Sequence, residues 1–245
     1  MRRFGCALLP MLLLASPSTA HAQVDAFAGP LSPGNWMSTF NMDPVSQLVQ
    51  QERRKADGRA APSSAPLSPV PASELRFAPS TERRRANLAA FVHKARAVDP
   101  TGAQQLATLF ASGDIIARME PELAKVGLHT NNLADAYALW WINCWSAVHG
   151  DTSTQSRTAI DAVKAQAARA LIAGGKTAGT SDTLKQQFAE AMLVQALLLD
   201  GALQQAKGDA KQLQLLSTAA NKGALEMGLD MRTMRLTPRG FVSGA

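Results

Sequence analysis

The chain has 245 residues, of which 46% are hydrophobic, 18% are charged and only 5% are aromatic. Twenty-five Lys and Arg residues against nineteen Asp and Glu residues give a net charge of +6. This excess is mild, and no basic stripe is interleaved with aromatic residues, so the composition argues against nucleic-acid binding. The four histidines and two cysteines show no metal-ligand spacing such as HExxH, so we expect neither a metal nor another cofactor.

Residues 1–22 have the features of a cleaved signal peptide. Arg2 and Arg3 precede an apolar run that is too short to span a bilayer, and Ala20-His21-Ala22 supplies the small residues that signal peptidase requires. We therefore expect cleavage after Ala22 and a periplasmic or secreted protein with no transmembrane segment in the mature chain. Cys144 is then left without an intramolecular partner, and its apolar neighbours favour a buried structural residue over a reactive thiol.

Residues 23–75 are expected to form a loosely ordered arm. The segment 58–73 is rich in Pro, Ala and Ser and is typical of a linker. Before it, Asp43-Pro44 is a favoured start for one short helix that would end at Gly58. Residues 76–245 are expected to form a single helical domain.

From Ser80 onward, apolar residues recur at helical spacing, which predicts an all-α fold, an irregular bundle of about six helices. Pro121 should interrupt one of them. Arg83, Arg84 and Arg85 begin the first helix, where a solvated face is favoured over a site for an anionic lipid or glycan. The predicted segments are 80–98, a second that opens at Asp99-Pro100, 114–127, 132–149, 153–171, 181–208 and 209–227. The tail that follows should be extended, with a turn at residues 237–240.

The stretch NNLADAYALWWINCWSAVHGD, residues 131–151, is the most distinctive part of the chain. Asn132 is a suitable N-cap with Asp135 as its capping-box partner, and Gly150 suits the position after the last turn. At 100° per residue the aromatic rings and Cys144 fall in one wide apolar arc, which favours a core helix over a groove for sugar rings or peptide side chains.

The narrow polar side of this helix and the residues before it supply the candidate ligand-binding residues: His129, Asn132, Asp135, Asn143, Ser146 and His149. A structural hydrogen-bond partner is favoured over a ligand for Asn143 and Ser146. A His129–Asp135 hydrogen bond could begin a catalytic group, but no GxSxG elbow supplies a nucleophile. The segment GGKTAGTS, 174–181, lacks the spacing of a phosphate loop and should connect two helices.

The segments 77–100, 128–151 and 227–242 resemble an exported bacterial family catalogued only as a domain of unknown function, number sixty-six eighty-three. NNLADAYALWW is the most specific part, Pro121 departs from the family pattern, and the arm before residue 75 lies outside the resemblance. The family has no assigned reaction, cofactor or catalytic residues. The resemblance therefore implies a secreted, helical, single-domain protein and nothing narrower.

Two classes of function remain open at this point. The first is a non-enzymatic envelope protein that binds another envelope protein or a glycan through a face near the helix at 132–149. The alternative is an envelope hydrolase that uses His129 and Asp135. A third hypothesis is a structural component that oligomerises through its arm.

Overall fold

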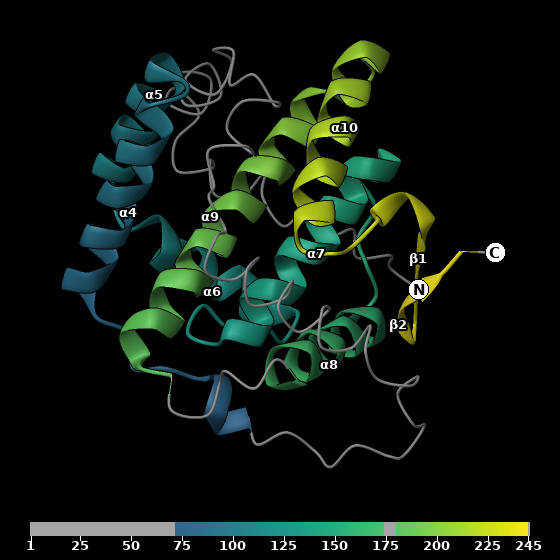
Figure 1. The fold of residues 1–245 in the computed structure, drawn as a ribbon, viewed down its shortest axis with the longest axis horizontal. Coiled ribbons are helices and arrows are strands. Elements are labelled where there is room, and N and C mark those ends of the chain that lie inside the picture. The colour runs from purple at the N-terminus through teal and green to yellow at the C-terminus, as the bar shows by residue number, and fades with distance from the viewer. Residues whose placement is uncertain (1–71, 174–179, 245) are drawn as a thin grey trace, which may run out of the picture.

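The computed structural model describes residues 72–173 and 180–244. In these residues the chain forms seven α-helices, two short 3-10 helices and one two-stranded sheet, which confirms the all-α fold (Figure 1). The predicted signal peptide, residues 23–71 of the predicted arm with its short helix, and most of the 174–181 connection lie outside the described residues. The helices are α4 (Thr81–Arg96), α5 (Pro100–Ala111), α6 (Ile115–Lys125), α7 (Leu133–His149), α8 (Arg157–Ala173), α9 (Asp182–Gln205) and α10 (Ala210–Glu226). The short elements are η2 (Ala72–Leu75), η3 (Met231–Thr233), β1 (Met234–Thr237) and β2 (Gly240–Ser243).

Side-chain caps explain where most of the helices begin. Ser80, Asp99, Asn132, Ser181 and Asp209 each accept a backbone N–H of the first turn. Such a cap contributes ~1 kcal/mol to helix stability. The starts predicted at these residues are therefore confirmed.

Two predicted helix features are wrong. α8 begins at Arg157 rather than near residue 153, because Asp151 accepts the Ser153 N–H and holds the preceding residues in a turn. α6 runs through Pro121 without a break. Pro121 removes the donor for the Ala117 carbonyl, but both residues are exposed, so water can satisfy that oxygen while Ile116, Met119 and their apolar neighbours hold the helix on the core.

α7 is the central helix and packs against α8, α9 and α10 (Figure 1). Thirteen of its seventeen residues are buried, including Tyr137, Trp140, Trp141 and Cys144. The expected core role of this aromatic row is confirmed, and burial raises the pKa of the Cys144 thiol well above its usual range, which keeps it protonated and unreactive. The rings also meet one another, with the Tyr137 and Trp141 centroids 6.3 Å apart in an edge-to-face arrangement.

The C-terminal tail is extended, as predicted, and it pairs with itself. β1 and β2 form an antiparallel hairpin in which Thr237 lies opposite Gly240, whose φ of 88° completes the turn. From α8, the Gln166 side chain donates to the Phe241 carbonyl and accepts the Phe241 N–H, both at 2.8 Å. The hairpin is thereby attached to the edge of α8 (Figure 1).

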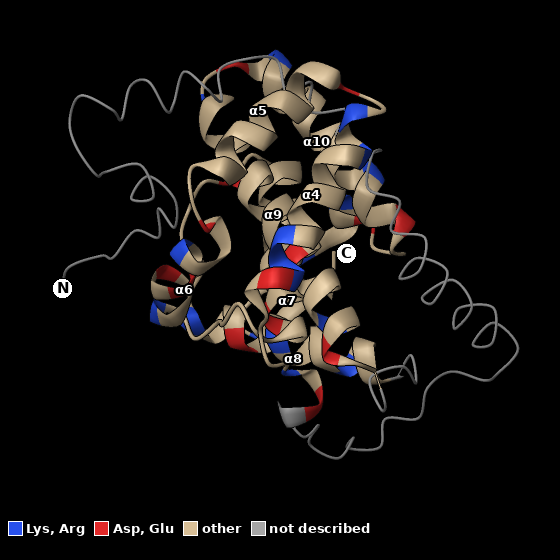
Figure 2. Cartoon of the chain, turned by 90° about the vertical axis from the view of Figure 1, so that its left-hand side faces the viewer, with Lys and Arg blue, Asp and Glu red and all other residues tan. Residues whose placement is uncertain are grey.

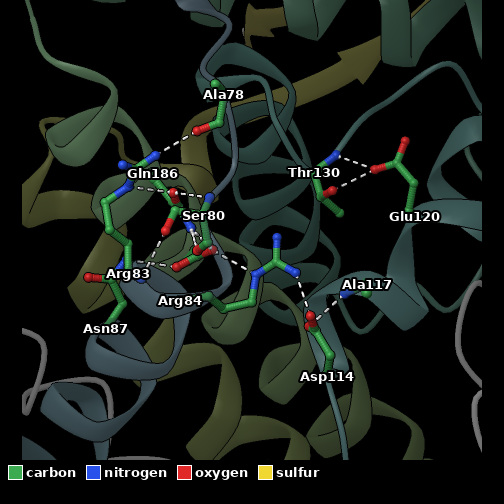
Figure 3. Close-up of polar contacts among 11 residues, drawn as sticks. Ala78, Ser80, Arg83, Arg84, Asn87, Asp114, Ala117, Glu120, Thr130 and Gln186 are labelled. Carbon is green, nitrogen blue, oxygen red and sulfur yellow. Dashed lines mark hydrogen bonds and ion pairs between the residues drawn. The ribbon is translucent and has the colours of Figure 1, made fainter.

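A network of polar side chains joins α4 to α9 and α6 (Figure 3). Arg84 donates to Glu190 at 2.9 Å and to Asp114 at 2.6 Å, while Arg83 donates to Gln186 at 2.9 Å. The solvated face predicted for the arginine triplet is therefore wrong for Arg83 and Arg84 and holds only for Arg85, which is exposed.

Candidate functional site

A small cleft opens between α7 and α9 beside the connection from α7 to α8. Its volume is about 60 Å³, enough for a few water molecules or one small chemical group. Apolar side chains of four helices form its walls, among them Met119, Leu123, Leu139, Ile142, Ile160, Leu197 and Leu203. We call this feature the α7–α9 cleft.

Two of the candidate residues, Asn143 and Ser146 of α7, line the α7–α9 cleft. The Asn143 side chain donates to the Ala196 carbonyl of α9 at 2.8 Å, which gives it the structural partner that we expected. No hydrogen bond of the Ser146 hydroxyl is found among the described residues. Opposite them, α9 contributes Asp200 and Gln204, and residues 151–155 close one side.

The charged lining of the cleft is acidic. Glu122, Asp151 and Asp200 line it, and none of the described lining residues is Lys, Arg or His. Two of these carboxyl groups have partners: Glu122 pairs with Lys125 at 2.6 Å, and Asp151 accepts from Ser153 and Gln155. Lys125 thus partly neutralises the charge of Glu122, while neutral donors occupy both oxygens of Asp151.

Asp200 differs from the other two acids. Its Oδ2 is buried and has no hydrogen-bond partner among the described residues. Burial raises the pKa of Asp200 to about 6, although a hydrogen bond from Gln204 acts in the opposite direction. Near pH 7 the cleft therefore holds a carboxylate that is largely ionised and short of donors.

The start of α7 holds three further candidate residues in a separate cluster. The Asn132 side chain caps α7 by accepting the Ala134 and Asp135 N–H groups. Asp135, which is fully buried, accepts the His129 backbone N–H at 2.9 Å and pairs with Lys164 of α8 at 2.7 Å. Burial nevertheless raises the pKa of Asp135, against the opposing effect of Lys164. The capping-box role expected for Asp135 is wrong, since its carboxylate faces His129 and Lys164 instead.

The imidazole of His129 does not bind Asp135, so the side-chain pair that the hydrolase alternative requires is not formed. Its Nδ1 lies 2.8 Å from Glu120 Oε1, and the other Glu120 oxygen accepts from the Thr130 N–H and hydroxyl (Figure 3). Neither His129 nor Asp135 lines the α7–α9 cleft. These contacts connect the α6–α7 loop to its neighbours and explain the positions of both residues.

His149, the last candidate, lies at the other end of α7. Its Nε2 donates to the Met231 carbonyl at 2.9 Å, and its ring lies 4.7 Å from that of Trp145, centroid to centroid. The Trp145 Nε1 in turn donates to the Met234 carbonyl. Both side chains therefore hold the η3–β1 segment on α7, which is a structural role.

The structure thus divides the six candidates among three places, and only Asn143 and Ser146 reach the cleft. Sequence reasoning missed Asp200, Gln204 and the 151–155 segment. One signal for Asp200 was present: it is the single charged residue in the largely apolar run AMLVQALLLDGAL of α9. A lone carboxyl on a helix that is buried on most sides must find a partner or keep a cavity.

Comparison with known proteins identifies the family. The chain matches the Family of unknown function (DUF6683) over residues 5–243. The protein belongs to this family. The match includes the arm, so the expectation that the family region begins near residue 75 is wrong.

No curated protein and no solved structure matches this DUF6683 chain. Within residues 72–173 and 180–244, no helix has the length and apolarity to cross a membrane. Nor do three or more His, Cys, Asp or Glu residues of this part of the chain gather closely enough to hold a metal ion. The α7–α9 cleft is therefore the main structural indication of function.

Proposed function

We propose that this DUF6683 protein is an exported, non-enzymatic binding protein of the cell envelope, and that its α7–α9 cleft receives a primary ammonium group of an envelope protein or glycan. The observation that carries the proposal is the buried Asp200 Oδ2, which lacks a donor in a cleft lined by acids and by no described base. An ammonium group supplies both a positive charge and three N–H donors.

The size of the cleft fits one such group and not a whole ligand. A volume of about 60 Å³ admits the tip of a lysine side chain or the amino group of a sugar, while the rest of the partner stays outside. A buried carboxylate oxygen without a donor, such as Asp200 Oδ2, carries a desolvation cost of ~1–3 kcal/mol or more. Pairing with an incoming ammonium group relieves this cost, because charge-assisted hydrogen bonds are the stronger kind.

The proposal that the protein is exported rests on its first residues. Arg2, Arg3, the short apolar run and Ala20-His21-Ala22 match the three regions of a signal peptide. Mass spectrometry of the protein from a periplasmic or culture fraction should give a chain that begins at Gln23. A chain with intact Met1, found only in the cytoplasmic fraction, would contradict export.

A binding function is preferred over hydrolysis because of the geometry around α7. The His129 ring faces Glu120, and the Asp135 carboxylate faces Lys164. The two side chains do not form the base-and-orienter pair of a hydrolase. The hydrolase alternative therefore gains no support from these contacts.

The binding proposal can be tested by NMR titration of the full mature chain. The probes are glucosamine and Nα-acetyl-lysine amide, each compared with its N-acetylated counterpart, which has the same shape but no charge. We expect the two amines to shift the Asn143 side-chain and Ser146 amide resonances, and the acetylated forms to leave them in place. The amine that binds more tightly indicates whether a glycan or a protein is the source of the ammonium group.

Two variants serve as the internal comparison. Asp200→Asn should abolish the shifts, because it removes the charge but keeps the side-chain shape. Glu226→Gln removes one charge from an exposed position on α10, away from the cleft lining, and should leave them unchanged. Equal shifts by charged and acetylated probes, or an unchanged titration in Asp200→Asn, would rule out the proposed ligand.

A further inference from the structure

A second surface feature lies on the opposite side of the bundle from the hairpin, between α4 and α5. It is an open groove of about 410 Å³. Apolar side chains of both helices form its floor: Leu88, Ala89, Val92, Ala107 and Phe110. The Phe110 ring is held edge-to-face against Phe91, with the centroids 5.9 Å apart, so part of the floor is fixed before any partner binds.

The rim of this α4–α5 groove is basic. Arg85, His93 and Arg96 line it, all three are exposed, and no acidic residue is among the described lining residues. None of the three side chains has a hydrogen bond or ion pair with any residue that the structure describes. The ribbon of α5 carries no Lys, Arg, Asp or Glu (Figure 2). The charged residues that line the groove therefore all belong to α4.

The other two arginines of the triplet, Arg83 and Arg84, have partners within the fold. Arg83 and Arg84 reach α9 and α6, where Gln186, Glu190 and Asp114 pair with them. Arg85 follows them directly in the sequence but points to the groove, where no such partner is provided. Arg83 and Arg84 therefore support the fold, whereas Arg85 is available to an external anion.

The spacing of the rim charges selects the kind of anion. Arg85, Ala89, Val92 and Arg96 follow at i, i+4, i+7 and i+11, so they lie on one face of α4. At 1.5 Å per residue the two arginines are roughly 16 Å apart along the helix axis. A single phosphate or carboxylate cannot reach both, whereas an acidic helix laid along the groove can.

We propose that the α4–α5 groove binds an amphipathic helix of a partner protein, whose apolar side chains meet the floor and whose acidic side chains pair with Arg85 and Arg96. This is the helix-in-groove mode of recognition, in which apolar anchors supply affinity and flanking charges set register and orientation. The arm of this chain fits the groove less well, since residues 23–71 contain four acidic and four basic residues. The inference is independent of the α7–α9 cleft and its ligand.

The test uses the full mature chain and two designed helical peptides. One peptide carries an apolar stripe with glutamates eleven positions apart, and the other has lysines at the same positions. Binding is followed by fluorescence anisotropy of the labelled peptide. We expect the glutamate peptide to bind the wild type, and the double variant Arg85→Glu/Arg96→Glu to bind it about tenfold or more weakly. The lysine peptide should bind the charge-reversed variant better than it binds the wild type.

The matched control is Arg169→Glu/Arg232→Glu, which reverses two exposed arginines of α8 and η3. It should bind the glutamate peptide as the wild type does, and circular dichroism should show the same helix content in all variants. The proposal would be overturned if the glutamate peptide did not bind, or if the control variant bound it as weakly as the charge-reversed variant does. It would also be overturned if the lysine peptide bound the charge-reversed variant no better than the wild type. Binding to phosphatidylglycerol vesicles that depends on Arg85 and Arg96 and displaces the peptide would assign the groove to a membrane surface instead, and would also overturn it.

Discussion

Two acidic residues of helix α9 have very different surroundings, the buried Glu190 and the half-buried Asp200. Glu190 is 1% exposed and accepts hydrogen bonds from Arg84, Asn87 and Gln186. Asp200 lies further along the same helix, and its buried Oδ2 has no partner among the described residues. A carboxylate that the fold fully satisfies is part of the structure, whereas one left short of donors beside a cleft is a candidate site.

The variant with the largest expected effect on stability removes Arg84, the cation that pairs with Glu190. In Arg84→Ala, Glu190 stays buried without its opposite charge, and Asp114 loses a partner as well. Breaking a buried pair on one side costs about 3–5 kcal/mol, and we expect the free energy of unfolding to fall by that amount in urea denaturation.

The neighbouring residue provides the control. Arg85 is exposed and has no ion pair with a described residue, so Arg85→Ala should change the free energy of unfolding by about 0.5 kcal/mol or less. Similar losses in the two variants would show that the Arg84 network does not stabilise the fold. Glu190 could then no longer be distinguished from Asp200 as a structural carboxylate.

The second test changes Asp200, and its expected effect has the opposite sign. The folded-state pKa of Asp200 is raised by burial from the usual 3.8 to about 6. The folded protein therefore binds more protons than the unfolded chain between these pH values, and stability falls as pH rises through this window. Above about pH 6 the cost is fully present, at up to about 3 kcal/mol. We expect Asp200→Asn to be more stable than the wild type at pH 7.5.

The pH dependence makes this second test specific. The stability difference between Asp200→Asn and the wild type should shrink as pH falls from 7.5 to 4, measured by urea denaturation at each pH. Asp135 also has a raised pKa, so the wild-type curve alone contains both groups, and only the difference between variant and wild type reports Asp200. A variant that is less stable at pH 7.5 would mean that Asp200 is satisfied in solution.

A third test removes one donor and leaves the charge pair in place. Asn87 donates to Glu190 Oε2 at 2.7 Å from the same helix that carries Arg84. In Asn87→Ala the carboxylate keeps Arg84 and Gln186, and we expect a loss of ~1–2 kcal/mol in the free energy of unfolding. Thermal or urea unfolding of this variant, compared with Arg84→Ala, separates the hydrogen bond from the ion pair. A loss as large as that of Arg84→Ala would contradict this separation.

The local features of α7 could be predicted from the sequence because they depend on residues close together in the chain. Asn132, Gly150 and the wide apolar arc define the helix and the burial of Trp140 and Cys144, as the structure confirms. Asn143 and Ser146 were also chosen for a local reason, since both lie on the narrow polar side. That they line a cleft follows from what α9 places opposite them.

The two carboxyl groups could not be distinguished in this way. Glu190 and its partner Arg84 are 106 positions apart in the sequence, so helix periodicity says nothing about their contact. The same limit explains the error over the arginine triplet, in which three consecutive residues have different neighbours. The His129–Asp135 pair failed for a related reason, because Glu120 and Lys164, from two other helices, compete for the two side chains.

The smallest expected effect concerns Gln204, whose hydrogen bond partly offsets the burial of Asp200. Gln204→Ala removes this donor while the carboxyl group stays in the cleft, so the pKa of Asp200 should rise above that of the wild type. Because the hydrogen bond joins a mostly exposed side chain, the free energy of unfolding at pH 7.5 should fall by less than ~1 kcal/mol. Carbon-13 NMR titration of the Asp200 carboxyl group measures the pKa directly, with the exposed Gln205→Ala as the control on the same turn. An unchanged pKa in Gln204→Ala would show that water in the cleft solvates the carboxylate, so that Asp200 would not need a donor from a ligand.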